Sequence, residues 1–423
     1  MNVMPENARV QKFFGRQLKN PAYRWDKVTD PRDLRGRRWK RVGELMNAML
    51  LGFVSGCGAL RKVERLTGGM GVFGRSYVTR RVPDTTLSEL IPRLSPNELR
   101  EQLISQVKAS WRNKELKPVG LPCGVATIDG KGLGALTHSA CGTAQLNHRE
   151  DGSEYYLSRV LRAVLTSAES RPCLDQMSIA SKTNEMGDFI PFYNRFLAAY
   201  GDNNDLFEIV DVDAGMTSKA NAERIHESQK AYVMALKGPQ QELLLEAERL
   251  LANRRKPDAE TLWERHQGKR IKRRLFVTQE MAGYHDWQHL RQVWRIEQVS
   301  ESRDGKVEQE ERYFLSSVPA ARLTPEQILL VVRGHWRVEN DCFWSLDMQW
   351  REDSAPWCRT GRATEILSLI RLMAYNLVQN ARRRTLRKKL RDGRREPPPT
   401  WDAVFAWINQ AWHIALEPNP ICG

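Results

Sequence analysis

Three carboxylates of this 423-residue chain lie where their charge needs compensation. Asp129 and Asp213 each follow a short apolar run, and Glu339 stands on the apolar stripe of a later helical segment. An ionised carboxylate against apolar surface is costly, but a bound divalent cation offsets its charge. Two metal ions held by three acidic groups suit phosphodiester chemistry, because one activates the attacking oxygen and the other stabilises the leaving oxygen. Asp129, Asp213 and Glu339 are therefore candidate metal ligands and catalytic residues.

Each of the three also has a purely structural interpretation. An aspartate near a glycine is often only a turn residue, and a glutamate in an amphipathic helix usually stands at the edge of the stripe. The stripe near Glu339 consists of Val332, Trp336 and Phe343, and the spacing of three or four positions predicts one shared face. Other acids, such as Asp211, are close in the sequence. Spacing alone leaves both interpretations open.

Strands and helices alternate around the first two carboxylates. Residues 125–129 and 207–213 each have the pattern of a buried strand that ends in an aspartate, and residues 231–238 form a third apolar run. Residues 187–200 have the pattern of an amphipathic helix. This alternation predicts an α/β domain whose sheet is covered on both faces, with polar side chains at strand ends facing the site.

Changes in composition divide the chain into four regions. Residues 1–115 carry arginine-rich helical patterns, which suit either a DNA-binding head with its own small core or a plain helical bundle. Residues 241–325 hold strand patterns joined by polar turns, which predicts a β-rich block. This block separates residues 116–240 from residues 326–380, and those two segments form the predicted catalytic domain. Residues 381–423 are basic and rich in tryptophan.

The composition favours a globular protein that binds a polyanion. Lysine and arginine total 66 against 51 aspartates and glutamates, and the net charge of +15 attracts nucleic acid first and anionic membrane second. The longest apolar run, 45–60, is too broken to span a bilayer, and the first residues lack the layout of a signal peptide. Seven cysteines without a close pair are expected to be reduced. These features predict a cytoplasmic protein without a membrane partner.

Five motifs occur in an order that resembles a known family. They are TIDGK at 127–131, DVDAGMTSKANAERI running on to YVMALKGPQ at 211–240, HQGKRIKRR at 266–274, YFLSSVP at 313–319 and RGHWRVENDCFWSLDMQWRED at 333–353. With them, the chain resembles the DDE transposases of bacterial insertion sequences, in the branch that includes the H-repeat-associated proteins. The segment DAGMTS replaces the more usual DAMGTQ of that family, but no departure removes a carboxylate.

The resemblance implies a ribonuclease H-like catalytic domain in which Asp129, Asp213 and Glu339 are the catalytic acids. Mg²⁺ would be the metal, with Mn²⁺ as substitute, and the block 241–325 would be the family's β-rich insertion. The implied activity is hydrolysis of the strand at the element end, followed by attack of the released 3′-hydroxyl on target DNA. Two alternatives stay open: a domesticated, non-catalytic DNA-binding protein, and a metal-dependent nuclease without strand transfer.

Basic residues supply candidate contacts to double-stranded DNA, both the terminal repeats of the element and its target. The candidates are Arg35, Arg37, Arg38 and Arg41 in the N-terminal region, Lys131 beside the first aspartate, Arg270 and Arg273 in the insertion, and Arg333 ahead of the glutamate. A homodimer on DNA, associated with the bacterial nucleoid, is the expected assembly.

Several residues with other side chains are further candidates. His335, Trp336 and Asn340 match the family pattern around the glutamate, and they either order its helix or contact DNA. Trp287 and Trp294 lie in the insertion, where each indole either stacks on an unpaired base or packs in the core.

Overall fold

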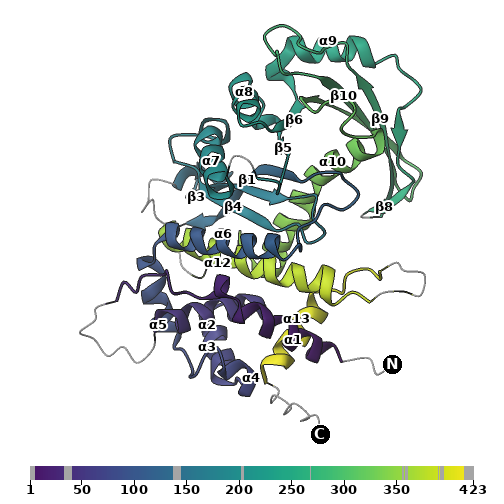
Figure 1. Cartoon of the computed structure of the whole chain (residues 1–423). Coiled ribbons are helices and arrows are strands. Elements are labelled where there is room, and N and C mark those ends of the chain that lie inside the picture. Colours follow the sequence, from purple (N-terminus) through teal and green to yellow (C-terminus); the bar gives the residue numbers. More distant parts are fainter. Residues whose placement is uncertain are drawn as a thin grey trace.

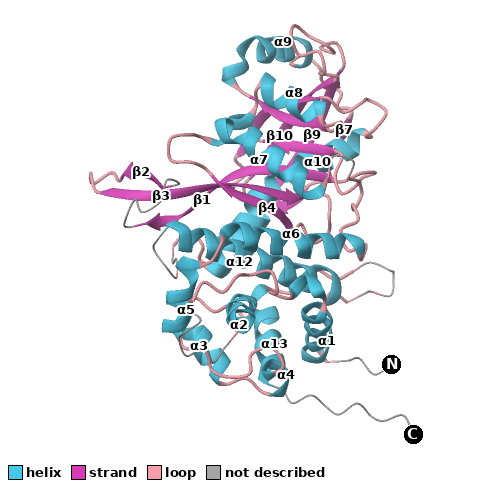
Figure 2. Cartoon of the chain, turned by 60° about the vertical axis from the view of Figure 1, so that its left-hand side comes forward, coloured by secondary structure: helices cyan, strands magenta, loops and turns pink. Residues whose placement is uncertain are grey.

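The protein is described here by a computed structural model, in which a mixed sheet lies above a layer of helices (Figure 1). The structure describes residues 5–32, 41–136, 144–201, 204–266, 268–354, 357, 361–388, 390 and 395–413. Within these ranges, eleven strands form one sheet, and the views in Figures 1 and 2 agree that helices cover both of its faces.

The strands are β1 (Val125–Leu136), β2 (Ala144–His148), β3 (Glu154–Leu165), β4 (Cys173–Ser178), β5 (Ile209–Val212), β6 (Ala231–Leu236), β7 (Ala259–Glu260), β8 (Glu264–His266), β9 (Lys269–Thr278), β10 (Gln292–Glu301) and β11 (Val307–Ser316). Their order across the sheet is β2-β3-β1-β5-β6-β11-β10-β9-β7, with β4 beside β3 and β8 beside β9. β5 pairs in parallel with β1 and β6, and the other pairs are antiparallel.

The α-helices are α1 (Glu6–Lys19), α2 (Val42–Val54), α3 (Leu60–Gly68), α4 (Val72–Arg75), α5 (Asp84–Leu90), α6 (Pro96–Arg112), α7 (Glu185–Tyr200), α8 (Lys219–Glu227), α9 (Gln241–Leu251), α10 (Pro325–Arg337), α11 (Trp344–Trp350), α12 (Gly361–Asn380) and α13 (Trp401–His413). Two π-helical segments, η5 (Val338–Phe343) and η6 (Ala381–Thr385), follow α10 and α12 directly. The helix predicted at 187–200 is α7, and the strand predicted at 231–238 is β6.

The two faces of the sheet belong to different cores. Successive side chains of a strand point to opposite faces. Accordingly, Ala126 and Ile128 of β1 join the large core that contains residues of α6, α7 and α12. Val125 instead joins a smaller core with Ile328 and Val332 of α10. Odd-numbered residues in this part of β1 therefore face α10, and this alternation determines which polar side chains reach the same side as Glu339.

The N-terminal and C-terminal helices form a layer below the sheet, as Figure 2 shows. α6 packs against both β4 and α12, α2 packs against α12, and α1 packs against α13. Arg100 of α6 forms a buried ion pair with Asp175 of β4, at 2.5 Å. Residues 1–115 therefore share a core with the rest of the chain. They do not form the separate small core that the sequence suggested.

The region 241–325 is rich in β-structure, as predicted, but its strands extend the catalytic sheet. β11 pairs with β6, which places Leu315 opposite Met234, and β10 and β9 follow outward. The helix α9 lies over these strands at the end of the molecule remote from α1 and α13 (Figure 1). Among the described helices, none has the length and apolar character needed to cross a membrane.

Candidate active site

The parallel pairing of β1 with β5 brings the two candidate aspartates to neighbouring positions. The pairing places Ile128 opposite Val212, and Asp129 and Asp213 are the next residues on each strand. Adjacent strands are about 4.8 Å apart. β5 ends at Val212, as predicted, whereas β1 continues past Asp129 to Leu136 and pairs there with β3. Asp129 is thus inside a strand, at the point where its parallel neighbour ends.

A buried hydrogen-bond network joins β1, at a position close to Asp129 in the sequence, to β5 and α10. Thr127 donates to Oδ2 of Asp211 at 2.9 Å, and Nδ1 of His335 lies 2.9 Å from the same oxygen. Burial alone would lower the pKa of His335, but the negative charges of Asp211, Asp129 and Asp213 raise it to about 9. His335 is therefore an imidazolium cation at neutral pH. Only 8% of His335 is exposed, which favours the ordering alternative over contact with DNA.

The charges of the other two carboxylates act on the pKa of Asp129. Burial raises the pKa of Asp129 to about 7, and although His335 acts against this rise, Glu339 and Asp213 add to it. Asp129 is 8% exposed, Asp213 is half-buried and Glu339 is exposed. The site thus combines one buried carboxylate with two that are more accessible.

Glu339 does not lie on the buried stripe that its spacing predicted. Val332 and Phe343 are buried and Trp336 is half-buried, but Glu339 is exposed. The reason is that the α-helical pattern ends at Arg337, and Glu339 belongs to the π-helical segment η5. A π-helical turn holds more residues than an α-helical one, so a spacing of three or four no longer keeps side chains on one face. Single π-helical turns occur frequently at functional sites.

Lys131, a predicted DNA contact, is paired with a carboxylate in this structure. Its Nζ lies 2.8 and 2.6 Å from the two carboxylate oxygens of Asp347, and it stands over the ring of Phe343 at 5.3 Å from the centroid. Only 9% of Lys131 is exposed. The ion pair instead attaches α11 and η5 to β1, so Lys131 helps to position the segment that carries Glu339.

A fourth acid near the site is Glu185, which the sequence did not single out. It stands in the first turn of α7, and a Cβ atom added at Gly130 would lie 1.9 Å from its Oε1. An added Cβ at Gly215 would lie 3.6 Å from Oε2 of Glu185 and 4.0 Å from Oδ2 of Asp213. Burial raises the pKa of Glu185, as does the charge of Asp213, while Arg159 lowers it. Only the pairing of distant segments brings Glu185 here.

The donor chemistry of this site suits a hard divalent cation, because carboxylate oxygens are the ligands that Mg²⁺ prefers. However, no group of three or more histidine, cysteine, aspartate or glutamate side chains within the described ranges is arranged to hold a metal ion. Asp129, Asp213 and Glu339 are thus near enough to affect one another electrostatically, but they do not form a closed set of ligands.

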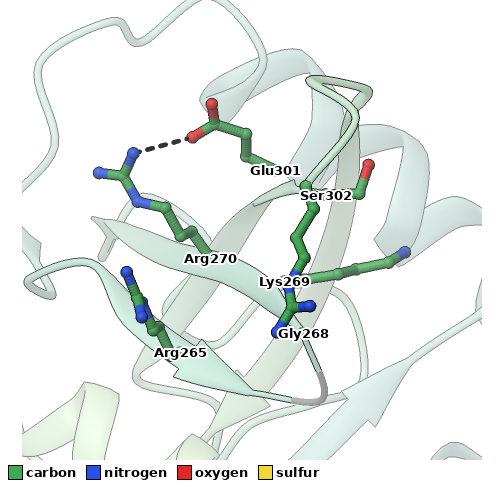
Figure 3. Close-up of a pocket in the computed structure, with 7 residues that line it drawn as sticks. Arg265, Gly268, Lys269, Arg270, Glu301 and Ser302 are labelled. Carbon is green, nitrogen blue, oxygen red and sulfur yellow. Dashed lines mark hydrogen bonds and ion pairs between the residues drawn. The ribbon is translucent and has the colours of Figure 1, made fainter.

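Several predicted DNA contacts gather beside the glutamate segment. Arg273, Arg333, Trp336 and Asn340 line one cavity of about 370 Å³. Arg270 lines a second cavity, of about 630 Å³, where it pairs with Glu301 (Figure 3).

The N-terminal candidates are only partly described by the structure. Arg41 is exposed at the start of α2, in the helical layer. Arg35, Arg37 and Arg38 lie outside the described residues.

Neither candidate stacking residue offers a ring face to a base. Trp294 is fully buried, and its indole nitrogen lies 3.2 Å from Oε1 of Gln292. Trp287 is 9% exposed and packs edge-on against Tyr232. Core packing, the alternative that the sequence left open, is therefore the observed role of both. The half-buried Trp336 and the exposed Trp263 are the tryptophans beside the two arginine-lined cavities, and each has an arginine over its ring.

Comparison with known proteins gives three findings. The model of the family described as "Transposase DDE domain" matches residues 162–377, which include Asp213 and Glu339 but not Asp129. The "H repeat-associated putative transposase YhhI" and the protein YbfL, both of Escherichia coli (strain K12), are each 29% identical over 197 residues, or 44% of this chain and 51% of the relative. The alignment thus spans about half the length of these curated relatives.

Among solved structures, the piggyBac transposase synaptic complex with hairpin DNA is similar at a TM-score of 0.43 and 12% identity, covering 97% of this chain and 80% of that one. The family match extends over more than half of the residues, and the five motifs and the carboxylate geometry agree with it. The chain therefore belongs to the DDE transposases of bacterial insertion sequences, in the branch of the H-repeat-associated proteins.

Proposed function

We propose that this transposase cuts one DNA strand at each end of its element and joins the released 3′-hydroxyl to target DNA at the site formed by Asp129, Asp213 and Glu339. The observation that carries the proposal is the convergence of these residues. Asp129 and Asp213 directly follow paired positions of neighbouring parallel strands. The charges of Glu339 and Asp213 both raise the pKa of the buried Asp129. The ribonuclease H-like assignment of the catalytic domain is part of the same proposal.

In this mechanism the carboxylates bind the metal and the surrounding residues hold them in place. Mg²⁺, with Mn²⁺ as substitute, would supply Lewis-acid activation of the attacking oxygen and stabilisation of the leaving oxygen. The His335 cation offsets repulsion among the acids while Asp211 fixes its ring. Water is the nucleophile for cleavage and the 3′-hydroxyl is the nucleophile for joining, so no serine, tyrosine or cysteine attacks the DNA.

The basic surface beside Glu339 would hold the DNA backbone. Arg273, Arg333 and Asn340 line a cavity adjacent to the glutamate segment, and Arg270 lines the next one. Phosphate contacts of this kind fix the position of a duplex without reading its sequence. We further propose that the active form is a homodimer on double-stranded DNA, bound to the terminal repeats, in the bacterial nucleoid.

The decisive test separates catalysis from binding. Asp129→Asn, Asp213→Asn and Glu339→Gln should each abolish cleavage of duplexes that carry the element ends, because each removes a ligand charge. All three should still bind these duplexes in a gel-shift assay, since the arginines that contact phosphate are unchanged. Asp205→Asn and Glu242→Gln, at exposed positions, are the matched controls and should cleave like the wild type.

The outcomes also separate the alternatives. Full cleavage by any of the three variants would exclude that residue as an essential ligand. Cleavage without joining to target DNA by the wild type would indicate a nuclease, and binding without cleavage in Mg²⁺ or Mn²⁺ would indicate a domesticated DNA-binding protein.

A further inference from the structure

The cavity next to Glu339 has an unusual concentration of positive charge. Its lining includes six arginines and only two carboxylates, Glu264 and Asp341. The arginines are Arg171, Arg265, Arg273, Arg333, Arg337 and Arg383. They come from the turn after β3, from β8, β9 and α10, and from η6. Segments far apart in the sequence therefore converge on one space of about 370 Å³.

The two carboxylates do not neutralise this cluster. Glu264 pairs with Arg333 at 2.6 Å and with Arg273 at 3.7 Å. Asp341 pairs with Arg171 and, at 3.3 Å, with Arg383. All four of these arginines share their carboxylate with another, so a considerable positive charge is left over.

Two arginines of the cavity have no such partner. The side chain of Arg337 is half-buried, yet it makes no hydrogen bond or ion pair within the described part of the chain, and the same holds for the exposed side chain of Arg265. A buried or half-buried cation without a counterion is unfavourable unless it serves a ligand. Arg337 and Asn340 lie on either side of Glu339 in the sequence and both line the cavity, so the cavity adjoins the segment that carries the proposed catalytic carboxylate.

The arginines also destabilise one another. Burial lowers the pKa of Arg171 to about 9, and the charges of Arg383 and Arg337 contribute to the decrease. Burial and the charge of Arg333 lower the pKa of Arg273 in the same way. An anion in the cavity would remove this repulsion.

Backbone strain and orphaned donors accompany the cluster. Arg171 has a positive φ of 44°, a conformation that is costly for a residue with a side chain. The Nε atoms of Arg171 and Arg273 are buried without a hydrogen-bond partner among the described residues. The fold thus maintains an arrangement that is unfavourable in the absence of a ligand, which is typical of a binding site.

The shape and surroundings of the cavity favour a phosphate group. Guanidinium groups bind phosphate oxygens in pairs, with a geometry that suits the planar fork of arginine. The indole of Trp336 lies between Arg273 and Arg312, with guanidinium carbons 4.7 and 5.2 Å from the ring centroid. This stacking holds the Arg273 head group in a fixed plane at the wall of the cavity.

The neighbouring cavity extends the basic surface outward. Arg265 lines both cavities, and it stands opposite Arg270 in the antiparallel pair of β8 and β9. Figure 3 shows Arg265 and Arg270 together at this second cavity, with Glu301 bonded to Arg270. A polyanion that enters the first cavity can therefore continue along β8 and β9, which is what a nucleic-acid strand with regularly spaced phosphates would do.

We infer that the cavity formed by Arg171, Arg333, Arg337 and Arg383 is a binding site for a phosphate group of the DNA strand that lies against Glu339. This inference rests on the proposed function for its DNA source, but not for its chemistry. The phosphate is either an internal diester of a continuous strand or the terminal 5′-phosphate that cleavage leaves on the flanking DNA. Arg265 and Arg270 hold the next part of the same strand.

A first experiment tests the anion site without DNA. Inorganic phosphate should raise the melting temperature of the full chain more than chloride does at the same ionic strength, because it relieves repulsion among the arginines. The increase should be smaller in Arg337→Gln. Arg24→Gln removes the same charge at an exposed position of the helical layer and should respond like the wild type. An equal increase in all three proteins would overturn the phosphate site whether or not the chain is a transposase.

A second experiment identifies the source of the phosphate. Affinities would be measured by fluorescence anisotropy in EDTA for labelled duplexes that are continuous, nicked with a 5′-phosphate, or nicked with a 5′-hydroxyl. Arg337→Gln should reduce the slope of log affinity against log salt by about one, the value for one phosphate contact. Loss from the continuous duplex indicates an internal diester, whereas a preference for the 5′-phosphate that disappears in the variant indicates the terminal group.

The controls keep both results interpretable. Arg337→Lys keeps the charge and should restore most of the salt dependence. Should Arg337→Gln fail to fold, Arg265→Gln tests the same cavity at an exposed residue. Salt slopes of these variants equal to that of Arg24→Gln on every duplex would contradict the inference, even if DNA cleavage is intact.

Discussion

Single side chains determine the charge balance of the carboxylate site. His335 is a buried cation whose ring is fixed by Asp211, and it is the side chain that lowers the pKa of Asp129 most. The site therefore contains its own partial compensation for the acids before any metal binds. The charged groups come from β1, β5 and α10, and His335 is the cation among them. Substitution of His335 alone should therefore reveal its contribution to the charge balance.

The His335 pair predicts a specific pH dependence of stability. The folded pKa of about 9 is above the ordinary value of 6.5, so the pair stabilises the fold fully below pH 6.5 and loses this effect as the pH rises through about 9. In urea unfolding with EDTA, wild type should exceed His335→Gln by on the order of 3 kcal/mol at low pH, and the difference should shrink across this window. His148→Gln, at an exposed histidine, is the control. A difference that does not change with pH would contradict the assigned charge.

Gly130 predicts a second result at this scale. A methyl group there would lie 1.9 Å from Oε1 of Glu185, so Gly130→Ala must displace that carboxylate from its place near Asp213. Because the displaced atoms are the end of a flexible side chain, we expect a loss of about 0.5–1.5 kcal/mol in unfolding free energy, the cost of a distorted rotamer. Most of the loss should disappear in the background Glu185→Ala, as a double-mutant cycle would show. Gly58→Ala, where nothing lies within 4 Å, is the control. Additive losses would mean that the two positions are not in contact.

The limits of sequence interpretation are clear at this scale. Asp213 could be placed because an apolar run before an aspartate is a local pattern, and residues 209–212 form β5 as expected. The partners of Lys131 and His335 could not be placed, because they are 216 and 124 positions away. Glu185 was missed for the same reason. Local periodicity reports the face of a residue, not the partner that tertiary pairing brings to it.

Among the elements, η5 carries the proposed catalytic residue Glu339, and buried ion pairs fix η5 and α11 to the sheet. Arg162 of β3 donates two hydrogen bonds of 2.8 Å to Glu352, just after α11, and both side chains are essentially inaccessible. Ser368 of α12 contacts both at 2.7 and 3.0 Å. Burial raises the pKa of Glu352, but Arg162 outweighs this effect and lowers it to about 2. Together with the Lys131 pair, this bridge fixes the segment that carries Glu339.

Breaking the bridge from one side should be costly. Arg162→Met leaves a buried carboxylate without its counterion, and we expect the unfolding free energy to fall by about 3–5 kcal/mol. The double variant Arg162→Met, Glu352→Gln removes the orphaned charge and should recover part of the loss. Denaturant unfolding of the single and double variants measures this coupling. A double variant as unstable as the sum of the singles would show that the bridge does not hold the segment.

The element scale also shows why the glutamate was assigned to the wrong face. Periodicity predicted a continuous α-helix through 332–343, whereas the α-helix ends at Arg337 and a π-helical segment follows. No residue in VENDCF has a strong local signal for this change. The buried contacts of Cys342 and Phe343 with the core favour it, and they depend on the tertiary structure.

At the scale of the whole molecule, both ends of the chain pack into one shared core. α6 packs on β4 and α12, and α1 packs on α13, so residues 1–115 complete the core of the catalytic domain. The four composition regions found in the sequence are therefore not four folding units. The composition of a region indicates the chemistry of its surface. It does not show whether two regions bury their apolar residues in the same core.

Removal of the N-terminal helices tests this view. A protein that lacks residues 1–115 should not give a stable catalytic domain, because the apolar faces of β4 and α12 would be exposed to water. Circular dichroism and urea unfolding should show loss of the cooperative transition rather than a smaller one. A well-folded truncated protein that still cleaves DNA would show that the helical layer is an independent domain.

The pairing of β11 with β6 has a mechanical consequence. Four residue pairs join these strands, so the insertion cannot swing as a hinged lid without breaking a ladder of backbone hydrogen bonds. The sheet is therefore continuous and stiff. Its outer strands carry Arg270 and Arg273, and the aspartates lie on or directly after its inner strands. If Arg270 and Arg273 bind DNA and the two aspartates bind metal, as proposed, the separation between the bound DNA and the reaction centre is a fixed property of the sheet. Fitting a strand into the site would require the DNA to bend rather than the protein to close.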